Sequence, residues 1–90
     1  MIWLFLPNLT IDCDVFDPSL FPAVNYPVPN GWFYKDFLEV IHPLLPKINL
    51  IGIDIVEYNS NKDSNGIAAN VVSNMVLDIL SVIGGKYGRN

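Results

Sequence analysis

The chain has 90 residues and a formal net charge of −4, with 51% hydrophobic and 16% charged residues. A chain this short forms one small domain at most, and such a domain buries only about 60 to 65% of the surface that its unfolded chain exposes. Its five Lys and Arg residues cannot form the basic stripe that nucleic-acid binding requires, so we predict no nucleic-acid partner.

The amino-terminal residues Met1–Leu6 are apolar but carry no basic segment and are stopped by Pro7. They fall far short of the ~20 residues that span a bilayer, so we predict neither a signal peptide nor a membrane partner. The single cysteine, Cys13, excludes an intramolecular disulfide. The sequence therefore favours a reduced, cytoplasmic protein.

The first predicted element is a β-strand over residues 9–15. Apolar and polar side chains alternate there with a period of two, which places Asp12 and Asp14 on one face and Cys13 on the other. A turn at Asp17 and a proline-rich loop are expected next. Because two neighbouring carboxylates repel each other, something is expected to offset this repulsion.

Apolar side chains at helical spacing predict a short helix over residues 32–42, which Pro43 is expected to end. Residues 48–57 form a nearly unbroken β-branched run, typical of a strand that is covered on both faces in a parallel sheet. Glu57 stands at the carboxyl end of that strand.

A second helical stripe covers residues 66–83, and the following Gly84 and Gly85 are expected to cap it. The order strand, loop, helix, strand, helix predicts two parallel neighbouring strands in an α/β protein. No linker or repeat divides residues 1–90, so we treat them as one unit. Two strands make a sheet too narrow to be stable alone, which predicts part of a larger domain.

Two motifs carry a family resemblance. "TIDCDVFDPSLFP", residues 10–22, resembles the Ser-x-Asp-x-Asp-x-x-Asp-Pro-x-x-x-Pro motif of the ureohydrolase superfamily of arginases, agmatinases and formimidoylglutamases, with Thr10 in place of Ser. "GIDIVEYNSNKDSNGIAA", residues 52–69, is similar to the next motif of that family. The resemblance implies the carboxyl-terminal part of a three-layer α/β/α parallel-sheet fold of the arginase type.

The resemblance also implies a chemistry. Asp12 and Asp14 match a pair that ligates two manganese ions in the family, and hard oxygen ligands suit Mn²⁺. Glu57 matches a glutamate that binds the substrate guanidinium. The implied activity is hydrolysis of a small linear guanidino substrate with release of urea, by a full-length form that is a homo-oligomer.

Three other residues receive structural interpretations. Asp17 precedes a proline and is interpreted as a residue that fixes a turn, not as a metal ligand. His42 matches no catalytic position of the family and is assigned to a helix end or the surface. Cys13 is assigned to packing.

Residues 22–27, "PAVNYP", replace the family's Pro-Gly-x-Gly-Thr-Pro, so that Ala23 and Asn25 stand in place of both glycines. We therefore expect a reshaped loop. Asn59 is more similar to the arginase motif, whereas "DSNGIAA" is more similar to the agmatinase motif. The identity of the substrate therefore stays open. The family's two histidine-bearing motifs do not occur in these residues. The alternative hypothesis is a non-catalytic remnant or interaction module that associates with a fuller homologue.

Overall fold

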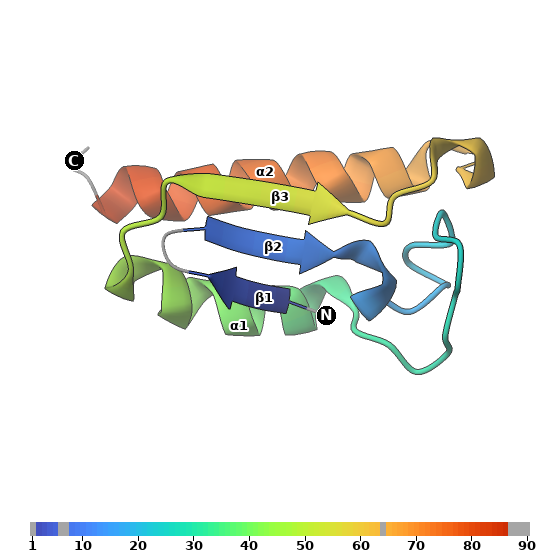
Figure 1. Ribbon diagram of the computed structural model, residues 1–90, viewed down its shortest axis with the longest axis horizontal. Helices are drawn as coiled ribbons and strands as arrows, with labels where there is room; N and C mark the ends of the chain where they lie inside the picture. The colour runs from blue at the N-terminus through green and yellow to red at the C-terminus, as the bar shows by residue number, and fades with distance from the viewer. Residues whose placement is uncertain (1, 6–7, 64, 87–90) are drawn as a thin grey trace.

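The computed structural model describes residues 2–5, 8–63 and 65–86, which form a three-stranded sheet and two long helices (Figure 1). Three short 3₁₀ turns connect these elements. In chain order the elements are β1 (Ile2–Phe5), β2 (Asn8–Asp12), η1 (Cys13–Val15), α1 (Tyr34–Leu44), η2 (Leu45–Lys47), β3 (Gly52–Val56), η3 (Ser60–Lys62) and α2 (Ile67–Lys86).

The sheet has the order β1-β2-β3. β2 and β3 are parallel neighbours, with Asn8 opposite Gly52 and Asp12 opposite Val56, as the sequence predicted. β1 pairs antiparallel with β2 and was not predicted. A four-residue apolar run has no periodicity of its own, so only pairing with β2 identifies it as a strand.

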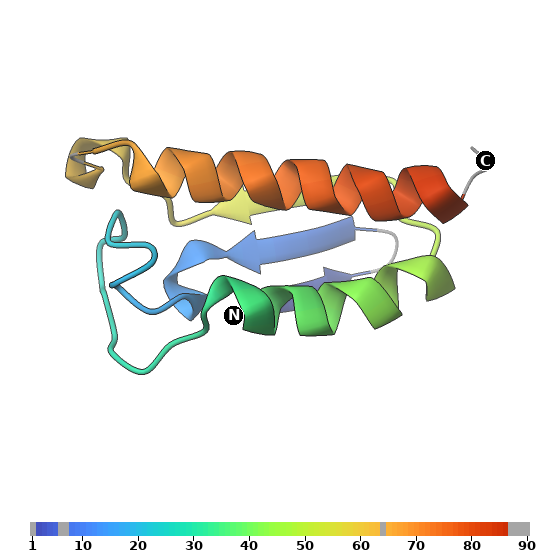
Figure 2. The same cartoon turned by 180° about the vertical axis from the view of Figure 1, so that it is seen from behind.

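Both helices lie on the same face of the sheet, behind the strands in Figure 1 and in front of them in Figure 2. In β2 the side chains of Leu9 and Ile11 are fully buried, whereas those of Thr10 and Asp12 alternate to the other face. The fully or nearly fully buried core consists of Leu9, Ile11, Cys13, Phe16, Phe21, Ala23, Val24, Phe37, Ile41, Leu45, Ala68, Val71, Met75 and Ile79.

The expectation that β3 is covered on both faces is wrong for the described structure. Asp54 is exposed, and Val56 keeps 40% of its surface accessible. The reason is that both helices pack on one side, which leaves the second face of β3 open. Only one face of this β-branched strand is therefore covered by the packing seen here.

Two predicted boundaries are corrected by local hydrogen bonding. The first strand ends at Asp12 instead of residue 15, because the chain turns into η1 there. α1 continues through Pro43 to Leu44, since the backbone N–H of Leu45 still donates to the carbonyl of Ile41. A proline in the last turn removes one hydrogen bond but does not stop the helical path.

α2 also runs further than predicted. It passes through Gly84 and Gly85 to Lys86, so the glycine pair is not its cap. A side-chain carbon added at Gly84 would meet nothing within 4 Å, so no close packing requires glycine there. Glycine costs about 1 kcal/mol relative to alanine in a helix, which the rest of a long helix can offset.

By length and composition alone, the segment Ile67–Gly84 of α2 could cross a membrane. Core helices pass the same test. In this fold one stripe of α2 packs in the core, through Ala68, Val71, Met75 and Ile79. The hydroxyl of Tyr34 donates to the carboxylate of Asp78 and joins α1 to α2.

Candidate functional site

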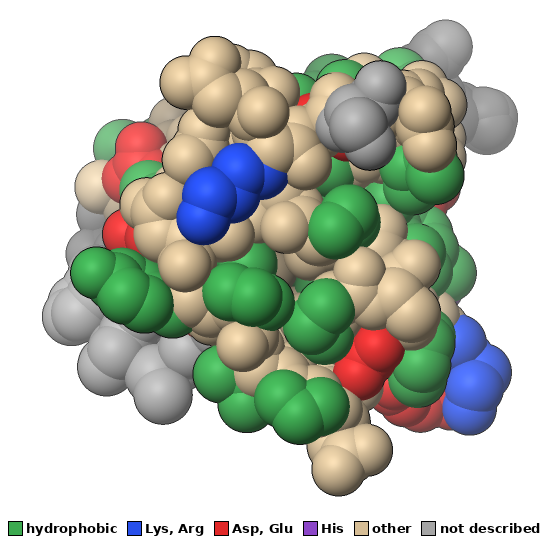
Figure 3. All heavy atoms as spheres, turned by 90° about the vertical axis from the view of Figure 1, so that its right-hand side faces the viewer, with side chains coloured by type: hydrophobic (Ala, Val, Ile, Leu, Met, Phe, Trp, Pro, Cys, Tyr) green, Lys and Arg blue, Asp and Glu red, His purple; other side chains and the backbone are tan. Residues whose placement is uncertain are grey.

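The carboxyl ends of β2 and β3 meet at one end of the sheet, at the right of Figure 1. Asp12 is the last residue of β2 and lies opposite Val56, the last residue of β3. Asp14 and Glu57 therefore follow the two strands at the same end. Figure 3 looks onto this end and shows acidic side chains at the left and lower right of a face that also carries hydrophobic side chains and Lys or Arg side chains.

Asp12 and Asp14 are neighbours because the chain turns between them. The backbone N–H of Asp14 donates to Oδ1 of Asp12 at 3.3 Å, and both residues are half-buried. The sequence predicted their proximity from strand alternation. That reason is wrong, since Asp14 lies in η1, but the two carboxylates are close together all the same.

The pKa of Asp14 reflects the burial of its carboxyl group and the acidic residues near it. Burial raises the pKa of Asp14, the hydrogen bond with Asp12 and the negative charge of Asp12 raise it further, and the charge of Glu57 adds to the effect. Asp14 thus lies beside Asp12 and also feels the charge of Glu57.

Glu57 has an unusual backbone conformation for its residue type. It follows β3 directly, is exposed, and has a φ of 64°, in the left-handed region. This conformation costs a non-glycine residue about 1–2 kcal/mol. The surrounding structure therefore holds Glu57 at the strand end against an intrinsic preference.

The loop over residues 22–27 is fastened beside Glu57 by Asn59. The backbone N–H of Asn59 donates to the carbonyl of Ala23 at 2.7 Å, and its side-chain Nδ2 donates to Oδ1 of Asn25 at 2.8 Å. Tyr26 projects outward with 78% of its surface exposed. The loop that departs from the family motif is thus an ordered border of the site. The hydrogen bond between Asn25 and Asn59 could not be predicted from the sequence, because a contact across 34 residues leaves no local signal.

Asp17 fixes the loop that leads away from the site, as predicted. Its Oδ2 accepts from the N–H of Ser19 at 3.0 Å and from the Ser19 hydroxyl at 2.6 Å. Its Oδ1 accepts from the N–H groups of Asn30 and Gly31 at 2.8 and 3.2 Å. These hydrogen bonds, that of the Ser19 hydroxyl foremost, hold the pKa of Asp17 below its usual value.

Cys13 and His42 also agree with their structural interpretations. Cys13 is fully buried, and burial, followed by the charges of Asp12 and Asp14, raises the pKa of its thiol to about 12. The thiol therefore stays protonated and packs as an apolar group. His42 is exposed in the last turn of α1, which runs back to the opposite end of the sheet (Figure 1).

The carboxylate oxygens of Asp12 and Asp14 are suitable ligands for a hard cation, because Mn²⁺ prefers oxygen ligands of this kind. Over residues 2–5, 8–63 and 65–86, however, no group of three or more His, Cys, Asp or Glu side chains could hold a metal ion. Asp12 and Asp14 therefore fit as part of a donor set that needs further ligands.

The fold and this arrangement define an arginase-type α/β protein. The sequence profile of the arginase family matches residues 8–81, and the chain belongs to that family. It is 32% identical over 76 residues to the mitochondrial arginase 1 of Arabidopsis thaliana and 36% identical over 80 residues to the agmatinase of Sodalis glossinidius. These alignments cover 83% and 89% of this chain.

Solved structures of arginase-type proteins have the same fold as this chain. The fold is similar to that of the agmatine ureohydrolase of Thermoplasma volcanium, with a TM-score of 0.74 and 29% identity over 87% of this chain. It is similar also to the arginase from Medicago truncatula, with a TM-score of 0.67 and 33% identity over 80% of this chain. The named members of the family are hydrolases.

The shared region is a small part of each relative. This chain spans 22% of the Arabidopsis arginase and 26% of the Sodalis agmatinase. It covers 25% of the Thermoplasma structure and 22% of the Medicago structure.

Proposed function

We propose that this chain carries the carboxyl-terminal share of a manganese-dependent amidinohydrolase site, which hydrolyses a small linear guanidino substrate and releases urea. The supporting observation is that Asp12 ends β2, while Asp14 and Glu57 follow β2 and β3 at the same end of this parallel pair. Parallel α/β sheets bind their ligands at this end. We propose a cytoplasmic homo-oligomer as the full-length form.

Asp12 and Asp14 are the proposed metal ligands. Burial and then the hydrogen bond with Asp12 raise the pKa of Asp14, and the negative charge of Asp12 raises it further; a divalent cation offsets such a charge. When bound, a manganese pair supplies a water of lowered pKa as the nucleophile. This chain's contribution is to hold two oxygen donors together through the η1 turn.

Glu57 is the proposed partner of the substrate guanidinium. A carboxylate accepts two parallel N–H bonds from this planar group, which fixes its orientation as well as its charge. Glu57 is exposed and its backbone direction is set by the left-handed turn after β3. We expect the loop that Asn59 holds by hydrogen bonds to Ala23 and Asn25 to contact the rest of the substrate.

The alternative function is a non-catalytic module. It is favoured by the donor count, because the described residues supply fewer than three metal ligands in one group. Under this alternative the chain binds to a fuller homologue and takes no part in catalysis.

The test uses the protein extended by the family's two histidine-bearing motifs, assayed for manganese-dependent release of urea from arginine and agmatine. We expect activity that Asp12→Ala or Asp14→Ala reduces at least about 100-fold in kcat/KM, since loss of even a supporting residue of a metal site costs about 10–100-fold. Glu57→Ala should act mainly by raising KM.

Glu39→Ala is the matched control, because Glu39 is an exposed carboxylate on α1 whose side chain lies 3.9 Å from Lys35. It should leave both kinetic constants unchanged. Full activity in the absence of both Asp12 and Asp14 would contradict the metal assignment.

A further inference from the structure

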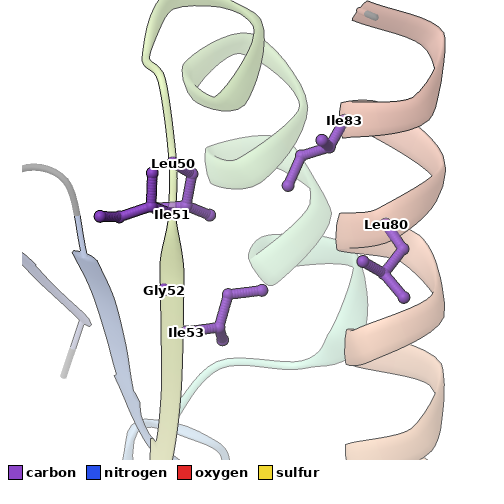
Figure 4. Close-up of a pocket in the computed structure, with 6 residues that line it drawn as sticks. All are labelled: Leu50, Ile51, Gly52, Ile53, Leu80 and Ile83. Atoms are coloured by element: carbon purple, nitrogen blue, oxygen red, sulfur yellow. The ribbon is translucent and has the colours of Figure 1, made fainter.

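The two ends of β3 differ in chemistry. At its start a groove of about 280 Å³ opens against α2, and the side chains that line it, such as those of Ile53 and Leu80, are all apolar (Figure 4). Beyond the carboxyl end of β3 the chain continues through Glu57, Tyr58 and Asn59, and polar groups from outside this stretch bind to it. The contacts that can orient a charged side chain therefore lie at the carboxyl end.

The two residues that follow Glu57 are both tied to other parts of the fold. Tyr58 donates its hydroxyl to the carboxylate of Asp63 at 2.9 Å. Asn59 donates its backbone N–H to the carbonyl of Ala23 at 2.7 Å. The positive φ of Glu57 is an unfavourable conformation, and such a conformation persists where the neighbouring residues are fixed in this way.

The side chain of Asn59 uses both ends of its amide group. Its Oδ1 accepts from the backbone N–H of Asn61 at 3.0 Å, and its Nδ2 donates to Oδ1 of Asn25 at 2.8 Å. Because the oxygen is engaged by Asn61, the NH₂ group faces the loop, and Asn25 must present its own oxygen. Ala23 and Val24, directly before Asn25, are buried, which keeps the loop in place for this contact.

The backbone at Asn25 does not itself require asparagine. In the described ranges 2–5, 8–63 and 65–86, the non-glycine residues with a positive φ are Asn30 and Glu57, so Asn25 does not use the left-handed conformation that asparagine tolerates. The motif that this loop resembles has a glycine here, which has no side chain to reach Asn59. The hydrogen bond to Asn59 is therefore a feature of this chain's own substitution.

We propose that Asn25 is a positioning residue for Glu57, because its hydrogen bond to Asn59 fixes the backbone that follows β3 and so directs the Glu57 carboxylate. The net stabilisation by one hydrogen bond is similar in size to the cost of one left-handed residue, so this contact is strong enough to shift that backbone. That the resulting direction serves guanidinium binding rests on the proposed function, whereas the geometry does not.

The test is NMR spectroscopy of the full 90-residue chain. A residue with a positive φ gives a strong nuclear Overhauser effect between its own amide and α protons, so this signal reports the backbone conformation of Glu57. Exchange of the Asn59 amide hydrogen with solvent reports the opening of its contact with the loop.

We expect Asn25→Ala to weaken the Glu57 signal and to speed exchange of the Asn59 amide about two- to tenfold, as the loss of one hydrogen bond predicts. Asn25→Asp keeps the acceptor oxygen and should match the wild type in both measurements. Asn74→Ala is the matched control, since Asn74 is an exposed asparagine within α2, and it should leave both measurements unchanged.

Circular dichroism verifies that the three variants keep the fold, which is expected because each substituted side chain is exposed. A wild-type chain in which Glu57 lacks the signal would overturn the proposal, as would an Asn25→Ala variant that matches the wild type in both measurements. Failure of Asn25→Asp to match the wild type would also overturn it, since the acceptor oxygen would then not be the cause. Neither measurement involves urea, so a failure of the proposed function is recognised separately.

Discussion

The backbone conformation of single residues at the strand ends determines how the side chains of the candidate site are oriented. Glu57 shows this most clearly. Together with Asn30, it is one of two non-glycine residues with a positive φ in the described ranges 2–5, 8–63 and 65–86. Strain of this kind persists where the surrounding structure over-determines a residue, often at a binding site. A glycine would adopt the same backbone freely but would lose the carboxylate.

We therefore predict that Glu57→Gly is more stable than Glu57→Ala by about 1 kcal/mol, because alanine retains the left-handed strain and glycine does not. The measurement is the free energy of unfolding in urea. At exposed Asp54 within β3, the order should be the usual one, with glycine less stable than alanine by about 0.5–1 kcal/mol. Equal stability of the two Glu57 variants would show that this backbone relaxes on substitution.

At the scale of elements, the start of α2 depends on a residue outside it. Asp63 accepts from the backbone N–H groups of Ala68 and Ala69 at 3.1 and 3.0 Å and from the hydroxyl of Tyr58 at 2.9 Å. Partial burial raises the pKa of Asp63, but these hydrogen bonds outweigh it and hold the pKa below the usual value of 3.8. The same side chain thus joins the end of β3 to α2.

Asp63→Ala should lower the thermal midpoint at neutral pH, because the first N–H groups of α2 lose their acceptor. The sign of the pH dependence follows from the lowered pKa. The stabilisation is complete above the unfolded-state value of 3.8 and is lost as the pH falls through the lower folded-state value.

Thermal midpoints of the wild type and of Asp63→Ala should therefore converge in acid. The exposed Glu39→Ala variant provides the comparison, and its difference from the wild type should stay small at all pH values. A difference for Asp63→Ala that persists unchanged in acid would contradict the role of its charge.

At the scale of the whole molecule, the fold is asymmetric. Both helices cover one face of the sheet, the other face and the edge of β3 stay open, and Asp12 and Asp14 have no third metal ligand in their group within the described structure. Generating a metal-bound nucleophile needs a closed set of ligands whose orientation is held by surrounding side chains.

We predict that the purified 90-residue chain releases no urea from arginine or agmatine in the presence of Mn²⁺. The assay is colorimetric urea detection, with the Sodalis agmatinase as the positive control. Manganese-dependent release that Asp12→Ala abolishes would overturn this prediction, because it would mean that the chain completes its ligand set without the histidine motifs.

Local patterns in the sequence were sufficient for the parallel pair of strands, for both helices and for the loop-fixing role of Asp17. Each depends on side chains within a few residues of one another, such as the β-branched run of β3 or the hydrogen bonds from Ser19 to Asp17. The positions of Asp12, Asp14 and Glu57 at one end of the sheet also followed, since parallel strands bring their carboxyl ends together.

Tertiary structure decided what local patterns do not encode. β1 became a strand only by pairing with β2, and Asn25 meets Asn59 only after the loop folds back. Gly31 is required because a side-chain carbon there would lie 2.6 Å from the backbone nitrogen of Asp17, a segment distant in sequence. Such contacts join residues far apart along the chain, so their energy depends on the assembled fold and leaves no periodic signal in the sequence.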